Sequence, residues 1–211
     1  MKFKGNGSAG NSLPTNRLYT SKKSARIVDM RSWRTKYPLF ICKEMIEMTD
    51  YDLLAQQISS LAEDENLFIP VLSNASAILY ENIEDINWAG FYLMDKGSLM
   101  LGPFQGKVAC IRIPLGKGVC GTAAKEDRTV LVEDVHKFAG HIACDAASNS
   151  EIVIPIHCNG KVIGVLDIDS TSFDRFKFED QVGLEKFVRT LEGNTDFCRY
   201  NGTREDQFKE Q

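Results

Sequence analysis

Cysteines and paired acids gather in one glycine-rich stretch of the sequence. Cys110, Cys120 and Cys144 follow one another at spacings of 10 and 24 residues, and a strongly apolar segment ends in Asp167-Ile168-Asp169. Acids two positions apart on a strand face the same side. Close carboxylates raise each other's pKa, or they bind a cation or an ammonium group. The residue types therefore point to thiol chemistry beside a pair of carboxylates.

Two other roles are open to these cysteines. Three thiolates and His141 could hold zinc, but structural zinc sites use short pairs such as C-x-x-C, and the sequence has none. Cysteine is also often buried as a small hydrophobic residue, an interpretation that suits Cys42, Cys158 and Cys198. This interpretation is less convincing for Cys110, Cys120 and Cys144, because all three lie near the paired acids in the sequence. His141 could lower the thiol pKa of Cys144, or it could be a hydrogen-bonding residue of a loop.

The composition describes an acidic globular body with a basic leader. Of 211 residues, 43% are hydrophobic and 26% charged, and the net charge is -4. An acidic body argues against nucleic acid as a partner, and the absence of a long apolar run argues against a membrane span. Residues 1–28 carry six basic residues and no acidic one. Their glycine-rich start favours a flexible tail over an organelle transit peptide, and the lack of a secretory signal favours the cytoplasm.

Hydrophobic periodicity predicts helices first, then strands, then a closing helix. We expect helices over 54–61 and 68–79, the first capped by Thr49 or Asp50. Next come strands over 86–94, 99–101 and 108–115, a short helix over 119–126 and a strand over 129–132. A hairpin of 151–158 and 161–169, joined by Asn159-Gly160, precedes a helix over 178–191.

Segregated helices and strands predict an α+β fold, with a central antiparallel sheet whose flanking helices cover one face. The expected organisation is a disordered basic leader over 1–30, one domain over 31–195, and a polar C-terminal tail over 196–211.

Several motifs between Tyr51 and Val188 resemble those of the free methionine-(R)-sulfoxide reductases, a family built on a GAF domain. Generic GAF domains share the fold but lack this cysteine trio. The matching stretches are Asn87-Trp88-Ala89-Gly90-Phe91-Tyr92, Leu101-Gly102-Pro103-Phe104-Gln105-Gly106, Ala109-Cys110-Ile111-Arg112-Ile113, Gly116-Lys117-Gly118-Val119-Cys120-Gly121-Thr122-Ala123, Asp134-Val135-His136, Gly140-His141-Ile142-Ala143-Cys144-Asp145, Ser150-Glu151-Ile152-Val153 and Gly164-Val165-Leu166-Asp167-Ile168-Asp169-Ser170.

The resemblance implies a GAF-like domain that reduces free L-methionine-(R)-sulfoxide through a cysteine sulfenic acid and an intramolecular disulfide. By resemblance Cys144 is the nucleophile, Cys110 the resolving thiol and Cys120 a second resolver. The family's acidic pocket corresponds to Glu151, Asp167 and Asp169, which would hold the substrate ammonium and protonate or polarise the sulfoxide oxygen. Its aromatic wall corresponds to Trp88, which Tyr92 could join.

The same resemblance implies no bound cofactor and no metal, because an external dithiol such as thioredoxin supplies the electrons. A homodimer through the flanking helices is compatible with a GAF domain. Two rival functions remain open. One is a ligand-binding GAF module without catalysis, although 211 residues leave little room for the output domain of a sensor. The other is a redox-sensing protein whose thiols pair but reduce no substrate.

Overall fold

The computed structural model describes residues 49–63, 67–140 and 146–197. The basic leader and nearly all of the C-terminal tail lie outside the described residues, so the predictions made for them stay untested. The same holds for Cys42, His141, Cys144 and Cys198.

Three helices carry the helical periodicity of the sequence: α2 (Tyr51–Ala62), α3 (Phe68–Asn82) and α5 (Phe178–Asn194). The predicted cap of α2 is confirmed at Asp50, whose side chain accepts a hydrogen bond from the backbone N–H of Leu53 at 3.0 Å. Leu54 and Ile58 are buried, one helical turn apart. Leu61 is exposed although it lies seven residues after Leu54. The buried face of α2 runs through Tyr51, Ala55, Ile58 and Ala62, so Leu54 lies at its border and Leu61 just outside it.

Six strands form one antiparallel sheet in the order β3-β2-β1-β6-β5-β4. The predicted hairpin is confirmed: Asn159 and Gly160 both have positive φ, as the two-residue turn requires. The strands are β1 (Trp88–Asp95), β2 (Ser98–Gly106), β3 (Arg112–Pro114), β4 (Val130–Val132), β5 (Ser150–Cys158) and β6 (Lys161–Ser170).

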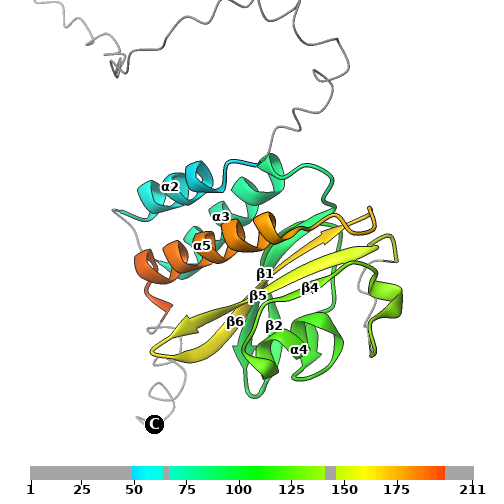
Figure 1. Cartoon of the computed structure of the whole chain (residues 1–211). Coiled ribbons are helices and arrows are strands. Elements are labelled where there is room, and N and C mark those ends of the chain that lie inside the picture. The colour runs from blue at the N-terminus through cyan, green and yellow to red at the C-terminus, as the bar shows by residue number, and fades with distance from the viewer. Residues whose placement is uncertain (1–48, 64–66, 141–145, 198–211) are drawn as a thin grey trace, which may run out of the picture. The chain divides into compact units, whose positions relative to one another are not determined.

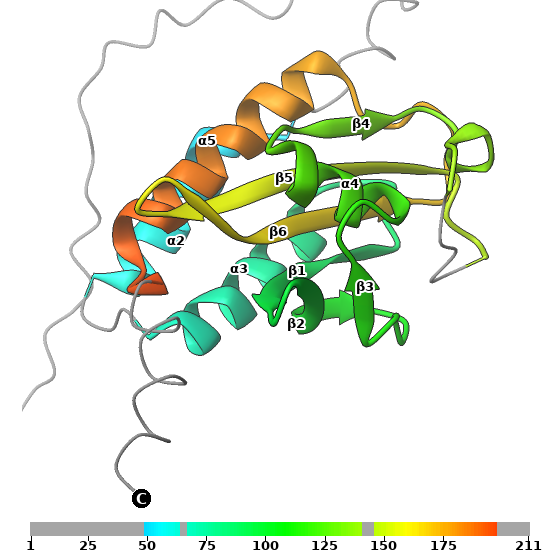
Figure 2. The same cartoon turned by 90° about the horizontal axis from the view of Figure 1, so that it is seen from below.

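The helices cover both faces of the sheet, whereas the sequence predicted coverage of one. Figure 1 shows α2, α3 and α5 on one face, where alternate residues of β1 such as Phe91 join the larger apolar core. On the opposite face lies α4 (Gly118–Glu126), which packs with Trp88 and Tyr92 of β1 (Figure 2). Because side chains alternate along a strand, each strand supplies both cores.

The alternating segment 108–115 forms a much shorter strand than predicted. Only Arg112–Pro114 pairs with β2, at the edge of the sheet. Val108 and Ile111 are 88% and 72% exposed. Alternation predicts a buried face only where a partner covers the strand, and at this edge the pairing with β2 ends after three residues. A short 3-10 helix, η2 (Val135–Lys137), lies in the irregular region between β4 and β5.

Among the described residues, no helix has both the length and the apolar character needed to cross a membrane.

Candidate active site

The sheet places the predicted acids in one row beside an aromatic residue. Trp88 of β1 pairs with Asp169 of β6, and Asp169 pairs with Glu151 of β5. Asp167 lies two residues from Asp169 and therefore points to the same face, opposite Gly90 of β1. Three of the four residues come from sequence positions more than 60 residues from Trp88, so only the register of the sheet unites them.

Cys120 reaches this acidic row from α4. Its Sγ and one carboxylate oxygen each of Glu151 and Asp167 all lie within 4.8 Å of one another. The thiol donates a hydrogen bond to Oε1 of Glu151 at 3.7 Å. The three side chains are nearly closed off from solvent, with exposed fractions of 4% for Cys120 and 6% for each acid. The cluster is thus a buried thiol and two buried carboxyls.

Burial and mutual repulsion keep protons on this cluster. Desolvation, and then the charges of Asp167 and Asp169, raise the pKa of Glu151 well above its ordinary range. Desolvation also raises the pKa of Asp167 to about 6, although hydrogen bonds from Cys120 and Glu151 lower it in part. Oδ1 of Asp167 has no hydrogen-bond partner among the described residues. The site therefore offers a neutral carboxyl that can donate a proton, beside an acid poised to bind a cationic group.

An aromatic wall borders the acids. Trp88 stacks on Tyr92 and Phe104, with ring centroids 5.9 and 5.3 Å apart, and its indole N–H donates to the backbone oxygen of Lys107 at 3.1 Å. Phe104 was not among the predicted site residues. The sequence feature that could have indicated Phe104 is Gly90, the residue opposite it on β1. A Cβ atom on Gly90 would lie 2.3 Å from the Cβ of Phe104. The glycine leaves the space that the stacked rings fill.

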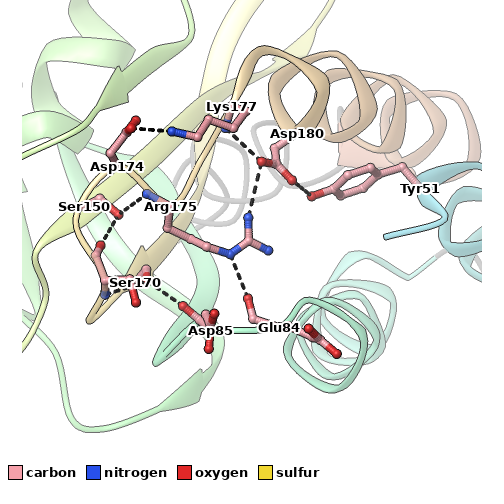
Figure 3. Close-up of polar contacts among 10 residues, drawn as sticks. Tyr51, Glu84, Asp85, Ser150, Ser170, Asp174, Arg175, Lys177 and Asp180 are labelled. Atoms are coloured by element: carbon pink, nitrogen blue, oxygen red, sulfur yellow. Dashed lines mark hydrogen bonds and ion pairs between the residues drawn. The ribbon is translucent and has the colours of Figure 1, made fainter. Parts of the chain in front are cut away.

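A hydrogen-bond network anchors the strand ends that carry the acids (Figure 3). Ser150 precedes Glu151 and accepts from the backbone N–H of Arg175, while Ser170 follows Asp169 and donates to the backbone oxygen of Asp85. Both serines are fully buried. Ser150 thus ties β5 to the turn before α5, and Ser170 ties β6 to the turn between α3 and β1.

Arg175 extends this network to the helices. Its guanidinium donates to the backbone oxygen of Glu84 at 2.9 Å and to the carboxylate of Asp180 at 3.3 Å. Asp180 also accepts from the hydroxyl of Tyr51 at 2.6 Å (Figure 3). Burial raises the pKa of Tyr51, so this hydroxyl stays a donor. No sequence motif predicted these anchors, because they join residues distant in the chain.

Cys110 and Cys158 do not belong to the cluster of Cys120, Glu151 and Asp167, and the other three cysteines lie outside the described residues. Cys110 is a half-buried free thiol just before β3, and it packs against the same core as Trp88 and Cys120. Cys158 packs against the helix-covered core, but it is disulfide-bonded, so the prediction of a free, apolar cysteine at this position is wrong. Cys144, the predicted nucleophile, is not described.

Both described histidines hold structural hydrogen bonds. A ring nitrogen of His136 lies 2.9 Å from Oδ1 of Asn149. His157 bridges Asp127 at 2.6 Å and Glu192 at 3.1 Å, so it joins the end of α4 to α5. These contacts make both histidines structural residues of the fold.

Cys120, Glu151 and Asp167 are also the type of donor set that holds a zinc ion with an open position. Burial raises the pKa of Glu151 and of Asp167, so protons compete with a metal ion for these donors.

Comparison with known proteins identifies the family. A model of the GAF domain matches residues 51–193. The free methionine-R-sulfoxide reductase of Escherichia coli is 54% identical over 153 residues, which span 71% of this chain and 93% of that protein. The reduced form of fRMsr of Staphylococcus aureus superposes with a TM-score of 0.67 at 56% identity, over 69% of this chain and 95% of that one.

A free methionine-R-sulfoxide reductase from Neisseria meningitidis, solved in complex with its substrate, superposes with a TM-score of 0.68 at 41% identity, over 72% of this chain and 91% of that one. Since the fold, the matched region and the level of identity agree throughout, the chain belongs to the GAF domain family and, within it, to the free methionine-(R)-sulfoxide reductases.

Proposed function

We propose that this chain is an oxidoreductase that reduces free L-methionine-(R)-sulfoxide to methionine. The observation that carries the proposal is the row of buried Glu151, buried Asp167 and half-buried Asp169 beside the stacked ring of Trp88. Relatives named for this activity, from Escherichia coli and Saccharomyces cerevisiae, are 54% and 50% identical to the chain. Two similar structures are described as complexes with substrate.

Substrate recognition follows from the chemistry of the row. A free amino acid carries an ammonium group, which an ionised Asp167 or Asp169 in a buried site binds far better than an exposed carboxylate would. The methyl group of the substrate packs on Trp88, with Tyr92 and Phe104 behind it. A site that holds the ammonium group has no place for the preceding residue of a peptide, so peptide-bound methionine sulfoxide is excluded.

The reaction begins with Cys144 as the nucleophile. Its thiolate attacks the sulfoxide sulfur, and the oxygen takes a proton from a neutral carboxyl of the site, for which Glu151 and Asp169 are the candidates. The protonated oxygen then passes to the sulfur of Cys144, as its bond to the substrate sulfur and the bond between the two sulfurs break. Methionine leaves, and Cys144 is a sulfenic acid. The sulfoxide is thereby reduced by two electrons and Cys144 is oxidised by two.

Cys110 then resolves the sulfenic acid. Its thiol condenses with Cys144 to a disulfide, and water leaves. The partial exposure of Cys110 suits this step better than the burial of Cys120 does. An external dithiol such as thioredoxin reduces the disulfide and restores both thiols, so no bound cofactor is required.

The test measures methionine formed from separate R and S epimers of free methionine sulfoxide, first with dithiothreitol and then with thioredoxin and its reductase. We expect turnover of the R epimer alone and no turnover of an R-sulfoxide within a peptide. A folded protein that reduces neither epimer would refute the proposal and favour a ligand-binding GAF module.

Variants assign the steps. Cys144→Ser should abolish methionine formation. The matched variant Cys110→Ser should still release about one methionine per chain in a single turnover, because the attack precedes resolution. Asp169→Asn should lower kcat more than it raises KM if Asp169 serves the sulfoxide oxygen. Loss of the single-turnover burst in Cys110→Ser would contradict the order of the two thiols.

The dependence on a reducing partner supports action in the cytoplasm.

Apolar side chains exposed on the helices support a homodimer. Leu53 and Leu61 on α2 and Ile69 on α3 are about half exposed. Light scattering should give twice the mass of the chain. Leu53→Glu combined with Leu61→Glu should return the mass of one chain, and an unchanged mass would place the interface elsewhere.

A further inference from the structure

The structure holds Cys120 in one position above the acids. Cys120 is the third residue of α4, and the first turn of this helix packs tightly on the turn before it. The backbone N–H of Gly116 donates to the oxygen of Gly121 at 2.7 Å, and a Cβ on Gly121 would lie only 2.4 Å from the oxygen of Pro114. The neighbouring backbone thus fixes the position from which the Cys120 side chain points.

We propose that Cys120 is a positioning residue, whose protonated thiol donates a hydrogen bond to Glu151 and fixes the Glu151–Asp167 pair for proton transfer. This inference rests on the proposed function and assigns Cys120 a role distinct from that of a resolving thiol. It stands on three observations: the 3.7 Å contact to Oε1 of Glu151, the convergence of all three side chains within 4.8 Å, and their common burial.

The surroundings of Cys120 disfavour a redox role. Burial, followed by the charges of Asp167 and Glu151, raises the thiol pKa well above its ordinary value. Thiol exchange needs a thiolate and access for the attacking or leaving sulfur. A thiol facing two carboxyls at 4% exposure offers neither. What it retains is one S–H donor, which reaches Oε1 of Glu151 at 3.7 Å.

The hydrogen bond has a defined effect on the acids. Glu151 accepts from Cys120 on Oε1, and its carboxyl also shares a hydrogen bond with Asp167. The three groups therefore form a chain of hydrogen bonds, in which Cys120 on one side and Asp167 on the other fix the orientation of the Glu151 carboxyl. The bond from Cys120 lowers the pKa of Glu151, against the larger effect of burial. Without it the proton is held more tightly and is given up more slowly.

The decisive experiment compares three variants of Cys120. Cys120→Ser keeps a donor in a similar volume, Cys120→Val fills the volume without a donor, and Cys120→Ala removes both. A positioning donor ranks kcat as Ser above Val and Ala. A packing residue, in the apolar cluster that also holds Val119 and Ala123, ranks Val above Ser. Melting temperatures of all three variants separate loss of folding from loss of the donor.

Two further readouts distinguish positioning from packing. The alkaline limb of the kcat/KM profile should move up by roughly half to one pH unit in the Ala and Val variants and stay near wild type in Ser, because a lost donor makes Glu151 a weaker acid. After one turnover without reductant, mapping of alkylated peptides should find Cys120 as a free thiol. An unshifted limb in Ala and Val, Val ranked above Ser, or Cys120 within the disulfide would overturn the proposal.

A spectroscopic measurement keeps this test independent of the proposed function. The S–H stretching band of Cys120, identified by its loss in Cys120→Ala, should shift in Glu151→Gln in the reduced full-length protein. A wild-type chain that forms no methionine yet shows this shift would refute the enzymatic function alone. An active wild-type chain with an unshifted band would refute the hydrogen bond alone.

Discussion

Replacing Asp167 by asparagine should stabilise the reduced protein at neutral pH. Asp167 is 6% exposed, its Oδ1 has no hydrogen-bond partner among the described residues, and its pKa is raised from 3.8 to about 6. The folded protein therefore binds this proton more tightly than the unfolded chain does. The stability linked to Asp167 is fully present below pH 3.8 and is lost as the pH rises through about 6.

The size of the effect follows from the shift. A rise of roughly two pH units corresponds to about 3 kcal/mol at 1.36 kcal/mol per unit. Asparagine must still be hydrogen-bonded in the buried site, so we expect a gain of about 1–3 kcal/mol above pH 6. For a domain of this size such a gain raises Tm by roughly 3–10 °C.

Thermal unfolding followed by circular dichroism from pH 4 to pH 8, with a reductant present, measures this effect. The wild-type Tm should fall relative to Asp167→Asn as the pH rises from 4 to 6. Glu81→Gln, which removes an exposed carboxyl on α3, serves as the matched control and should follow the wild type. Activity of Asp167→Asn should drop, because the site loses one member of its acid pair.

Parallel curves for wild type and Asp167→Asn, or a lower Tm of the variant at pH 7, would refute the reasoning. Either result would mean that a cation or an ordered water network already compensates the charge of Asp167.

Three other predictions test the surroundings of the site. Gly121→Ala should lower the free energy of unfolding in urea by about 1–3 kcal/mol and lower kcat, because the new Cβ meets the oxygen of Pro114. The control Gly193→Ala, whose Cβ would have no atom near it, should be neutral or stabilising. Equal effects of the two variants would contradict the close packing of α4. Burial is the largest single effect on His157 and lowers its pKa, but the hydrogen bonds to Asp127 and Glu192 together outweigh it, so the pKa is raised. His157→Gln should therefore be less stable than wild type below pH 6.5, with a difference that shrinks as the pH rises through the raised pKa; a difference that grows with pH would reverse the sign of this argument. Removal of divalent metals by a chelator should leave methionine formation unchanged, and stoichiometric zinc in the purified protein would mean that an ion, not protons, neutralises the acids.

Much of the fold could be predicted from the sequence, because local patterns set it. The Asn159-Gly160 turn, the cap at Asp50 and the periodicity of the helices all depend on residues close in the chain. The paired positions of Asp167 and Asp169 were also predictable, because the period of a strand puts both on one face. The same alternation predicted a strand over all of segment 108–115, but only three of its residues pair with β2, because pairing depends on where the partner strand lies.

The sequence by itself determined the α+β class, the paired acids and, through its motifs, the resemblance to a family of thiol reductases. Tertiary structure decided which groups meet. Only the strand register brings Trp88, Asp169 and Glu151 into one row, and only the packing of α4 on the second face of the sheet brings Cys120 to the acids. The physical reason is that these contacts join residues far apart in the chain. Their burial, which raises the pKa values of Glu151 and Asp167, is likewise a property of the folded protein and of no single segment.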